Sequence, residues 1–150
     1  MENIEFIKKT ITELLEKMNF KGEVSIDSSD KDNILVNIST DEAGFLIGQA
    51  GVNLDALQYL SRVLISKKSD KSVQFLLDIN DYRKNRINFL KELAGNISKQ
   101  ALSERAAITL QPMPAHERRI IHLALVDHPE INTESIGDES ERRIVIKPIK

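Results

Sequence analysis

Apolar residues in this chain recur at two different spacings, and the order of these spacings limits the folds that the chain can adopt. A spacing of three or four residues predicts a helix with one buried face, whereas strict alternation predicts a half-buried strand. The helical spacing runs from Glu2 to Asn19, and alternation follows in "EVSIDSS" (23–29) and "NILVNIS" (33–39). Turn-forming residues separate the two alternating stretches, so we expect an N-terminal helix followed by a β-hairpin.

A pair of glycines interrupts the next helical stretch. We expect a short helix from Asp41 to Ile47, then Gly48 and Gly51, then a second helix that ends near Lys67. The apolar stretch "SVQFLLDI" that follows is bounded by turn residues, which is typical of a strand. The first half of the chain therefore has the predicted order α-β-β-α-α-β.

The second half has a different order. Helical spacing from 82 to about 107 predicts a long helix, and a short strand that Pro112 ends comes after it. Proline suits the first turn of a helix, so we expect the next helix over 114–126 and a second hairpin over 130–149. The predicted order is α-β-α-β-β. The residues expected on the buried stripe of the long helix are Ile87, Leu90, Leu93, Ala94, Ile97, Ala101 and Leu102.

These two orders predict an α+β fold made of two small modules, residues 1–80 and 81–150. The chain has 150 residues, of which 41% are hydrophobic and 29% charged, which is typical of a soluble globular protein. It has no cysteine, which excludes disulfides and thiolate metal sites. No run of about 18 apolar residues and no signal-peptide core is present, so we expect no membrane span and a cytoplasmic location.

Charge is distributed unequally between the two halves. Residues 1–80 hold nine Lys/Arg and thirteen Asp/Glu, a net charge of -4, whereas residues 81–150 hold twelve and ten, a net charge of +2. The positive residues of the second half cluster in "YRKNR" (82–86), "ERR" (117–119) and "ERRIVIK" (141–147). Two interpretations remain open, namely a local anion-binding face and ordinary solvated surfaces.

The glycine pair also has two interpretations. A sharp turn between helices often requires a positive φ, which glycine adopts at little cost. Alternatively, residues without a Cβ let a sugar-phosphate backbone approach the main chain, with the amides of the following helix facing the phosphates. Phe45, Leu46, Ile47 and Leu54 are apolar residues available to line a groove beside the pair.

Arg118 and His122 are four residues apart and therefore lie on one face of the predicted helix, whose inward residues we expect to be Ile121, Ala124 and Leu125. Such a guanidinium and imidazole can donate to a phosphate oxygen or a base, although an ordinary surface pair has the same spacing. Further cations that could contribute lie nearby in sequence or in the second hairpin: Arg119, Arg142, Arg143 and Lys147.

Several catalytic classes lack the residues that they need. A nucleotide-hydrolysing loop requires a lysine after its second glycine, and the segment 44–51 contains none. His116, His122 and His128 are spaced by six, which rotates each by about 240° around a helix, so they do not share a metal. We therefore expect no enzyme, no metal and no cofactor.

The segment "GFLIGQAGVNLDALQYL" (44–60) resembles the Gly-x-x-Gly region of KH domains, and α-β-β-α-α-β is the order of their type II form. In that family the loop grips the backbone of about four nucleotides of single-stranded nucleic acid. Family loops commonly hold a Lys or Arg between the glycines, whereas Gln49 and Ala50 are neutral, so we expect a weak clamp. The residues that the resemblance assigns to RNA contact are Ile47, Gly48, Gln49, Ala50, Gly51 and Leu54.

The segment "RRIIH" (118–122) resembles the core of the domain named for its Arg-x-x-x-His motif, which binds single-stranded nucleic acid. Together with "DINDYRKNR" (78–86) and "INTESIGDESERRIVIKP" (131–148), it is similar to the bacterial KhpB family, also called Jag or SpoIIIJ-associated protein. Members usually carry a further small N-terminal domain, which has no counterpart in this sequence. The acidic turn 138–140 also lacks a proline often found there. The residues assigned to RNA contact in this half are Arg118, Arg119, His122, Arg142 and Arg143.

The resemblance implies a cytoplasmic protein that binds single-stranded RNA. It also implies post-transcriptional regulation or RNA chaperone activity linked to cell division and envelope growth. The implied partner is the single-KH protein KhpA, with a homodimer as an alternative. Two other functions stay open, namely a protein-interaction adaptor, favoured by the acidic first half, and a binder of single-stranded DNA.

Overall fold

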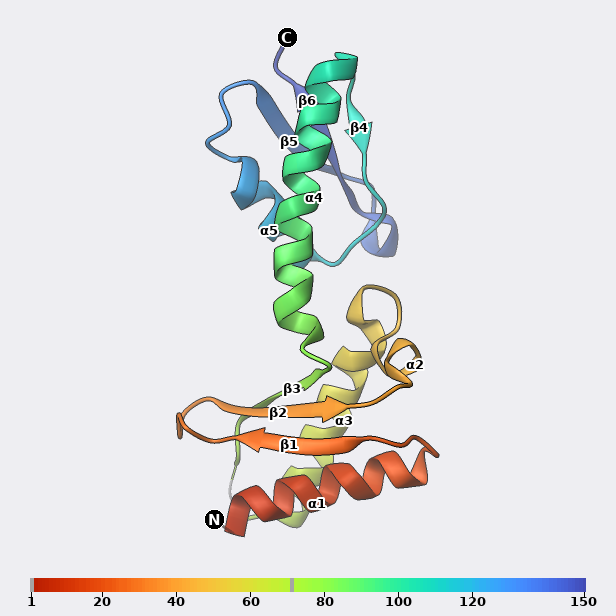
Figure 1. Cartoon of the computed structure of the whole chain (residues 1–150), viewed down its shortest axis with the longest axis vertical. Helices are drawn as coiled ribbons and strands as arrows, with labels where there is room; N and C mark the ends of the chain where they lie inside the picture. Colours follow the sequence, from red (N-terminus) through yellow and green to blue (C-terminus); the bar gives the residue numbers. More distant parts are fainter. Residues whose placement is uncertain (1, 71) are drawn as a thin grey trace. The chain divides into compact units, whose positions relative to one another are not determined.

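The computed structural model describes residues 2–70 and 72–150, and it divides the chain into two compact units, Met1–Arg83 and Lys84–Lys150. Figure 1 labels the elements of both units. The elements of the first unit are α1 (Glu2–Lys17), β1 (Glu23–Asp27), β2 (Ile34–Ser39), α2 (Ala43–Ile47), η1 (Gln49–Gly51), α3 (Val52–Lys68) and β3 (Phe75–Ile79). Those that follow are α4 (Tyr82–Glu104), β4 (Ile108–Thr109), α5 (Ala115–Leu125), β5 (Ile131–Ile136), η2 (Glu139–Glu141) and β6 (Arg143–Pro148).

The first unit is a three-stranded sheet covered by helices (Figure 1). The strand order is β1-β2-β3, with β2 antiparallel to β1 and parallel to β3. Helix α1 packs on β1 and α3, because Ile7, Ile11 and Leu15 recur every four residues and are fully or almost fully buried. The predicted order of the first half is confirmed.

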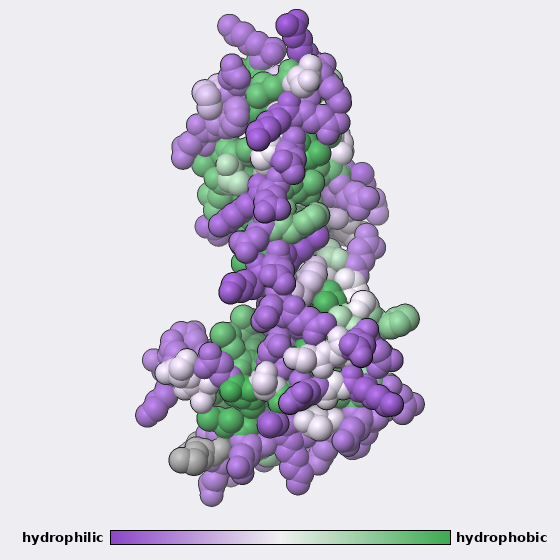
Figure 2. All heavy atoms as spheres, viewed as in Figure 1, coloured by the Kyte–Doolittle hydropathy of each residue, from purple (hydrophilic) through white to green (hydrophobic). Residues whose placement is uncertain are grey.

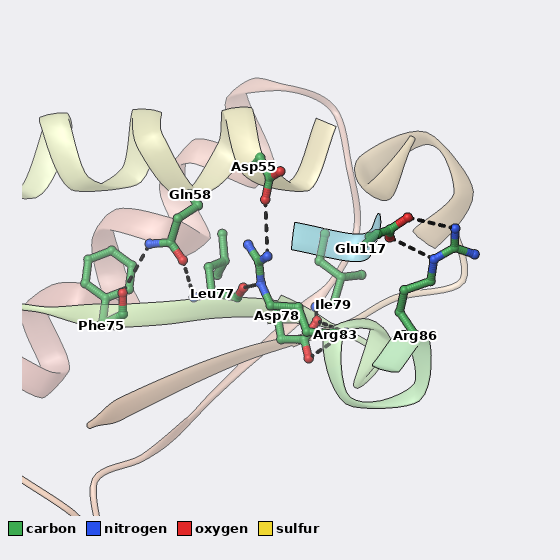
Figure 3. Close-up of polar contacts among 9 residues, drawn as sticks. All are labelled: Asp55, Gln58, Phe75, Leu77, Asp78, Ile79, Arg83, Arg86 and Glu117. Carbon is green, nitrogen blue, oxygen red and sulfur yellow. Dashed lines mark hydrogen bonds and ion pairs between the residues drawn. The ribbon is translucent and has the colours of Figure 1, made fainter. Parts of the chain in front are cut away.

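The free edge of β3 is occupied by a side chain from α3. Gln58 is buried; its amide nitrogen donates to the carbonyl of Phe75 at 3.2 Å, and its carbonyl oxygen accepts from the backbone N–H of Leu77 at 2.5 Å (Figure 3). An amide side chain thus satisfies two backbone groups that an edge strand would otherwise leave unpaired. This pairing fixes α3 against the sheet.

The second unit is an antiparallel sheet of order β4-β6-β5 with its own core. Helix α5 packs on β5 and β6. The core is made of Leu90, Ala94, Ala101, Leu110, Met113, Ile121, Leu125, Ile131, Ile144 and Ile146. The α+β class and the two-module arrangement are confirmed. On the face drawn in Figure 2 both units are largely hydrophilic, with apolar atoms visible among the polar ones.

Two predicted core positions are wrong. Ile87 is 41% exposed, because the residue of α4 that faces inward at that level is Arg86, which lies four positions before the buried Leu90. Ala124 is exposed, because the buried stripe of α5 is narrow and recurs every four residues, through Ile121 and its neighbours one turn away in each direction. Within residues 2–70 and 72–150, none of the helices has the length and apolar character to cross a bilayer.

Candidate nucleic-acid interface

Gly48 ends α2 in a backbone conformation that side chains rarely allow. Its φ is +70° and its ψ is -178°, a region essentially restricted to glycine. The side chain of Asn53 lies directly against it, since a Cβ at Gly48 would be 2.7 Å from the Asn53 Cγ. Asn53 is held there by donating from Nδ2 to the carbonyl of Phe45 at 2.8 Å. A side chain at position 48 is therefore excluded by both backbone and packing.

Gly51 begins α3 in the left-handed region, with a φ of +78° and a ψ of 14°. It is buried, and a Cβ there would be 3.1 Å from Cε1 of the Tyr82 ring. Loop geometry alone thus requires both glycines. The prediction that a sugar-phosphate backbone approaches them stays a prediction.

The two residues between the glycines form the accessible part of the loop. Gln49 is exposed, and Ala50 is half-buried with a φ of +52°, which is uncommon for a residue with a Cβ. Ile47 is half-buried at the end of α2. Leu54 is 0% exposed in the first core, so its side chain does not line the surface, contrary to the prediction. Its buried position holds the start of α3 on the core instead.

An apolar hollow of about 260 Å³ lies beside the loop segment. Of the residues predicted to line a groove here, Phe45 lies in the lining and is 76% exposed, and Leu46 lies there too but is only 3% exposed. The full lining consists of Met18, Phe20, Phe45, Leu46, Asn53, Ala56, Leu57 and Leu60. The hollow presents apolar surface without a cation.

The cluster "YRKNR" uses both of its arginines inside the protein. Arg83 donates from Nε to the carbonyl of Leu77 at 2.9 Å and from Nη1 to Asp55 at 3.1 Å, and Asp78 accepts its backbone N–H (Figure 3). Arg86 makes two parallel bonds, of 2.8 and 3.1 Å, with the carboxylate of Glu117. Both arginines are structural, so this cluster does not supply the expected anion-binding face.

Glu117 is a buried carboxylate at the start of α5, with a side chain that is 3% exposed. Its bidentate pair with Arg86 ties α5 to α4 within the second unit. The guanidinium of Arg86 also lies over the Phe89 ring, 5.2 Å from its centroid. The pair with Glu117 orients the helix that carries the Arg-x-x-x-His residues.

Arg118 and Arg142 converge on the hydroxyl of Ser135. Arg118 donates from Nη1 to Ser135 Oγ at 2.6 Å and from Nε to the Met113 carbonyl at 3.1 Å. Arg142 donates from Nε to the same oxygen at 2.9 Å and from Nη1 to the Gly137 carbonyl at 3.1 Å. Two guanidinium groups, one from α5 and one from the residue before β6, are thus brought together on β5.

His122 reaches the same strand two residues away. Its Nδ1 is 2.6 Å from the Thr133 Oγ1, and its ring is exposed. Thr133 and Ser135 are alternate residues of β5 and therefore point to one face. We name Arg118, His122, Thr133, Ser135 and Arg142 the β5 donor cluster.

The remaining predicted cations do not join this cluster. Arg119 is exposed on α5, and Arg143 donates to the carbonyl and carboxylate of Glu141 at 3.1 and 3.0 Å. Lys147 pairs with Glu134; its hydrogen bond and positive charge hold the pKa of the Glu134 carboxyl below its usual value.

Sequence reasoning missed two members of the cluster, Thr133 and Ser135. They are small polar residues at alternate positions of a predicted strand. Alternate positions share a face of the sheet, so this pattern is a usable signal for acceptors beside a neighbouring helix.

The β5 donor cluster carries positive charge without a carboxylate. Among residues 2–70 and 72–150, no Asp or Glu lies within ion-pair distance of Arg118 or Arg142. The same part of the chain contains no group of three or more His, Asp or Glu residues placed to hold a metal. Two cations held together without a counter-charge favour binding of an anion.

Comparisons with known proteins agree with this two-unit arrangement. A family model described as the KhpA/KhpB KH domain matches residues 4–77, and one described as the Arg-x-x-x-His domain matches residues 88–148. The chain is 34% identical over 144 residues to the RNA-binding protein KhpB of Clostridium symbiosum, covering 95% of this chain and 63% of that protein. It is 30% identical over 148 residues to the RNA-binding protein KhpB of Bacillus subtilis, covering 97% of this chain and 71% of that protein.

Both matches extend through the two units in order, which neither motif alone would show. The chain spans about two thirds of the length of these relatives. On this similarity, and on the two domain matches, the chain belongs to the KhpB family.

Proposed function

We propose that this chain binds single-stranded RNA through two surfaces, the Gly48–Gly51 loop of the first unit and the β5 donor cluster of the second. The observation that carries the proposal is the convergence of Arg118 and Arg142 on one neutral hydroxyl without a carboxylate partner among the described residues. The names of the relatives, RNA-binding protein KhpB, support RNA as the ligand.

The two surfaces contribute different interactions. The loop offers main-chain groups and the neutral Gln49, so its contacts are short-range hydrogen bonds to the sugar-phosphate backbone. The cluster offers guanidinium groups, with Arg119 and Arg143 as further cations on the same unit. Engagement of one strand by both surfaces raises the affinity above that of either alone through effective concentration. We place this activity in the cytoplasm, in post-transcriptional regulation or RNA chaperone action linked to cell division, with KhpA or a second copy as partner.

The test is binding of a short oligouridine, measured by fluorescence anisotropy, with variants in each surface. In the loop, Gln49→Asp with Ala50→Asp adds two charges that repel phosphate while both glycines stay in place. Gln49→Asn with Ala50→Asn is the matched control, because asparagine has the same shape without charge and also tolerates a positive φ. In the cluster, Arg118→Ala with His122→Ala removes two donors.

We expect each charged or truncated variant to lose affinity by roughly tenfold or more and the asparagine control to stay within about threefold of the wild type. Contacts to about three to five phosphates give a slope of log affinity on log salt of roughly -2 to -3.5. Equal binding by all variants, or affinity independent of salt, would refute the proposal. A deoxyuridine oligomer run in parallel distinguishes RNA from DNA through the 2′-hydroxyl.

A second candidate function is that of a protein-interaction adaptor. The apolar hollow and the 76% exposed Phe45 favour it, because an aromatic side chain beside a hollow is a common anchor in protein interfaces. Phe45→Ser would then abolish partner capture without changing RNA affinity. Loss of RNA affinity in that variant would instead assign the hollow to nucleotide contact.

A further inference from the structure

We propose that Ser135 positions Arg118 and Arg142 as one guanidinium pair that binds a single phosphate group, an inference that rests on the proposed function. Neither the Arg-x-x-x-His spacing nor the charge pattern draws attention to this serine. Its role is exerted through the two arginines, and no RNA contact is placed on the serine itself.

The hydroxyl of Ser135 holds both arginines at one point. Ser135 Oγ lies 2.6 Å from Arg118 Nη1 and 2.9 Å from Arg142 Nε. A serine oxygen has two acceptor lone pairs, so the two arginines use its full accepting capacity. The side chain is short, and β5 is paired with β6 at this level through Ser135 and Ile144. The acceptor is therefore held at a fixed point of the sheet.

The charges of the guanidinium pair are not neutralised by the groups that hold them. The other acceptors of both guanidinium groups are backbone carbonyls, namely those of Met113, Gly137 and Ser135 itself. These groups orient the cations and leave their charge in place. Two like charges that share one neutral acceptor repel each other, and an anion that bridges them removes that repulsion.

Both guanidinium groups keep donors in reserve. A guanidinium has five N–H donors, and Arg118 uses two of them in the bonds to Met113 and Ser135, which leaves three. Arg142 uses three, which leaves two. Arginine binds phosphate oxygens through pairs of parallel N–H groups. A phosphodiester group, with two unbridged oxygens, has the charge and acceptors to accept one arginine on each oxygen.

Three variants of the full chain test the role of Ser135, with oligouridine affinity and thermal unfolding measured on each. Ser135→Asp places a carboxylate between the two arginines. We expect an unfolding temperature at or above that of the wild type, because the carboxylate pairs with both cations, together with at least a roughly thirtyfold loss of affinity. The salt slope should fall by about 1.4, the value of two phosphate contacts on a single strand.

Ser135→Ala removes the shared acceptor, and we expect roughly a fivefold to tenfold loss of affinity. Ser135→Thr keeps a hydroxyl and suits a strand, so we expect affinity within about threefold of the wild type. A residue with a merely structural role would lose affinity and stability together in the aspartate variant. Gain or retention of stability with loss of binding is specific to the positioning role.

Failure of the positioning role and failure of the proposed function give different results. If Arg118→Ala with Arg142→Ala binds RNA as the wild type does, the cluster is not an RNA surface and both fail. If that double variant loses affinity while Ser135→Ala and Ser135→Asp bind normally, the arginines contact RNA but the serine does not position them. In that case only the positioning role of Ser135 is overturned.

Discussion

The two candidate surfaces are built in opposite ways. The Gly48–Gly51 loop is shaped by backbone conformation, with positive φ at three of its four residues and no charged side chain between the glycines. The β5 donor cluster is shaped by side chains that are held by hydroxyls and backbone carbonyls on a regular strand and helix. The loop is therefore sensitive to any substitution that changes its backbone or the core beneath it, whereas the cluster can be changed one charge at a time.

The largest effect is expected from Arg86→Met, which leaves the carboxylate of Glu117 buried without its bidentate partner beneath the cluster. Removing one member of a buried ion pair costs about 3–5 kcal/mol. We expect the second unit to unfold at lower urea concentration while the first unit keeps its transition. Arg86→Met combined with Glu117→Leu should recover much of this loss. Unfolding of the two units at an unchanged urea midpoint in the single variant would show that the pair does not hold α5.

A smaller loss is expected in the first unit from Gln58→Leu, which removes both bonds to the edge of β3. A buried backbone group left without a partner costs about 1–3 kcal/mol. The free energy of unfolding, from urea titration, should therefore fall by about 2–4 kcal/mol for the two groups. Gln58→Glu is the control, since it keeps one acceptor for the Leu77 N–H. Equal stability of the leucine variant and the wild type would mean that water replaces the amide.

Gly51→Ala should destabilise the first unit by about 1–3 kcal/mol, because alanine is strained at a φ of +78° and its Cβ would press on the Tyr82 ring. The matched control is Gly95→Ala in α4, where nothing lies within 4 Å of the added Cβ and alanine favours the helix by up to about 1 kcal/mol. Thermal unfolding of both variants checks the opposite signs. A shift of the same sign in both would contradict the requirement for glycine in the loop.

The smallest effect concerns the pair of Glu134 and Lys147 on the sheet of the second unit. Lys147 lowers the pKa of the Glu134 carboxyl, so the pair contributes stability above the unfolded pKa and loses it as the pH falls through the folded value. Lys147→Met should therefore lower the unfolding temperature slightly at about pH 7 and leave it unchanged at about pH 2. An equal decrease at both pH values would point to lost packing instead of charge.

Much of the fold follows from the sequence, because apolar spacing and turn residues agree along most of the chain. The predicted strands and helices lie within a few residues of those observed, and both hairpins are present. The errors have a common cause. The apolar character of single residues places Ile87 and Ala124 in the core and Leu54 at the surface groove, whereas burial is decided by which side chain faces the core at each turn.

The candidate site is only partly predictable from the sequence. The spacing of Arg118 and His122 identifies a shared helix face, but it does not show that β5 supplies the acceptors that hold them. The pairing of Arg142 with Arg118 depends on the return of β6 beside β5, a contact that spacing along one helix does not reveal. Charge clusters mislead for a similar reason, because Arg83 and Arg86 are used inside the protein.

Binding of a single strand's phosphate backbone by the paired arginines on β5 is tested most directly by salt dependence. The measurement is oligouridine affinity as a function of salt in the wild type and in Arg118→Ala with Arg142→Ala. We expect the slope of log affinity on log salt to become shallower by about 1.4 in the double variant, with weaker binding at low salt. An unchanged slope together with unchanged affinity would contradict a role for these arginines in binding RNA.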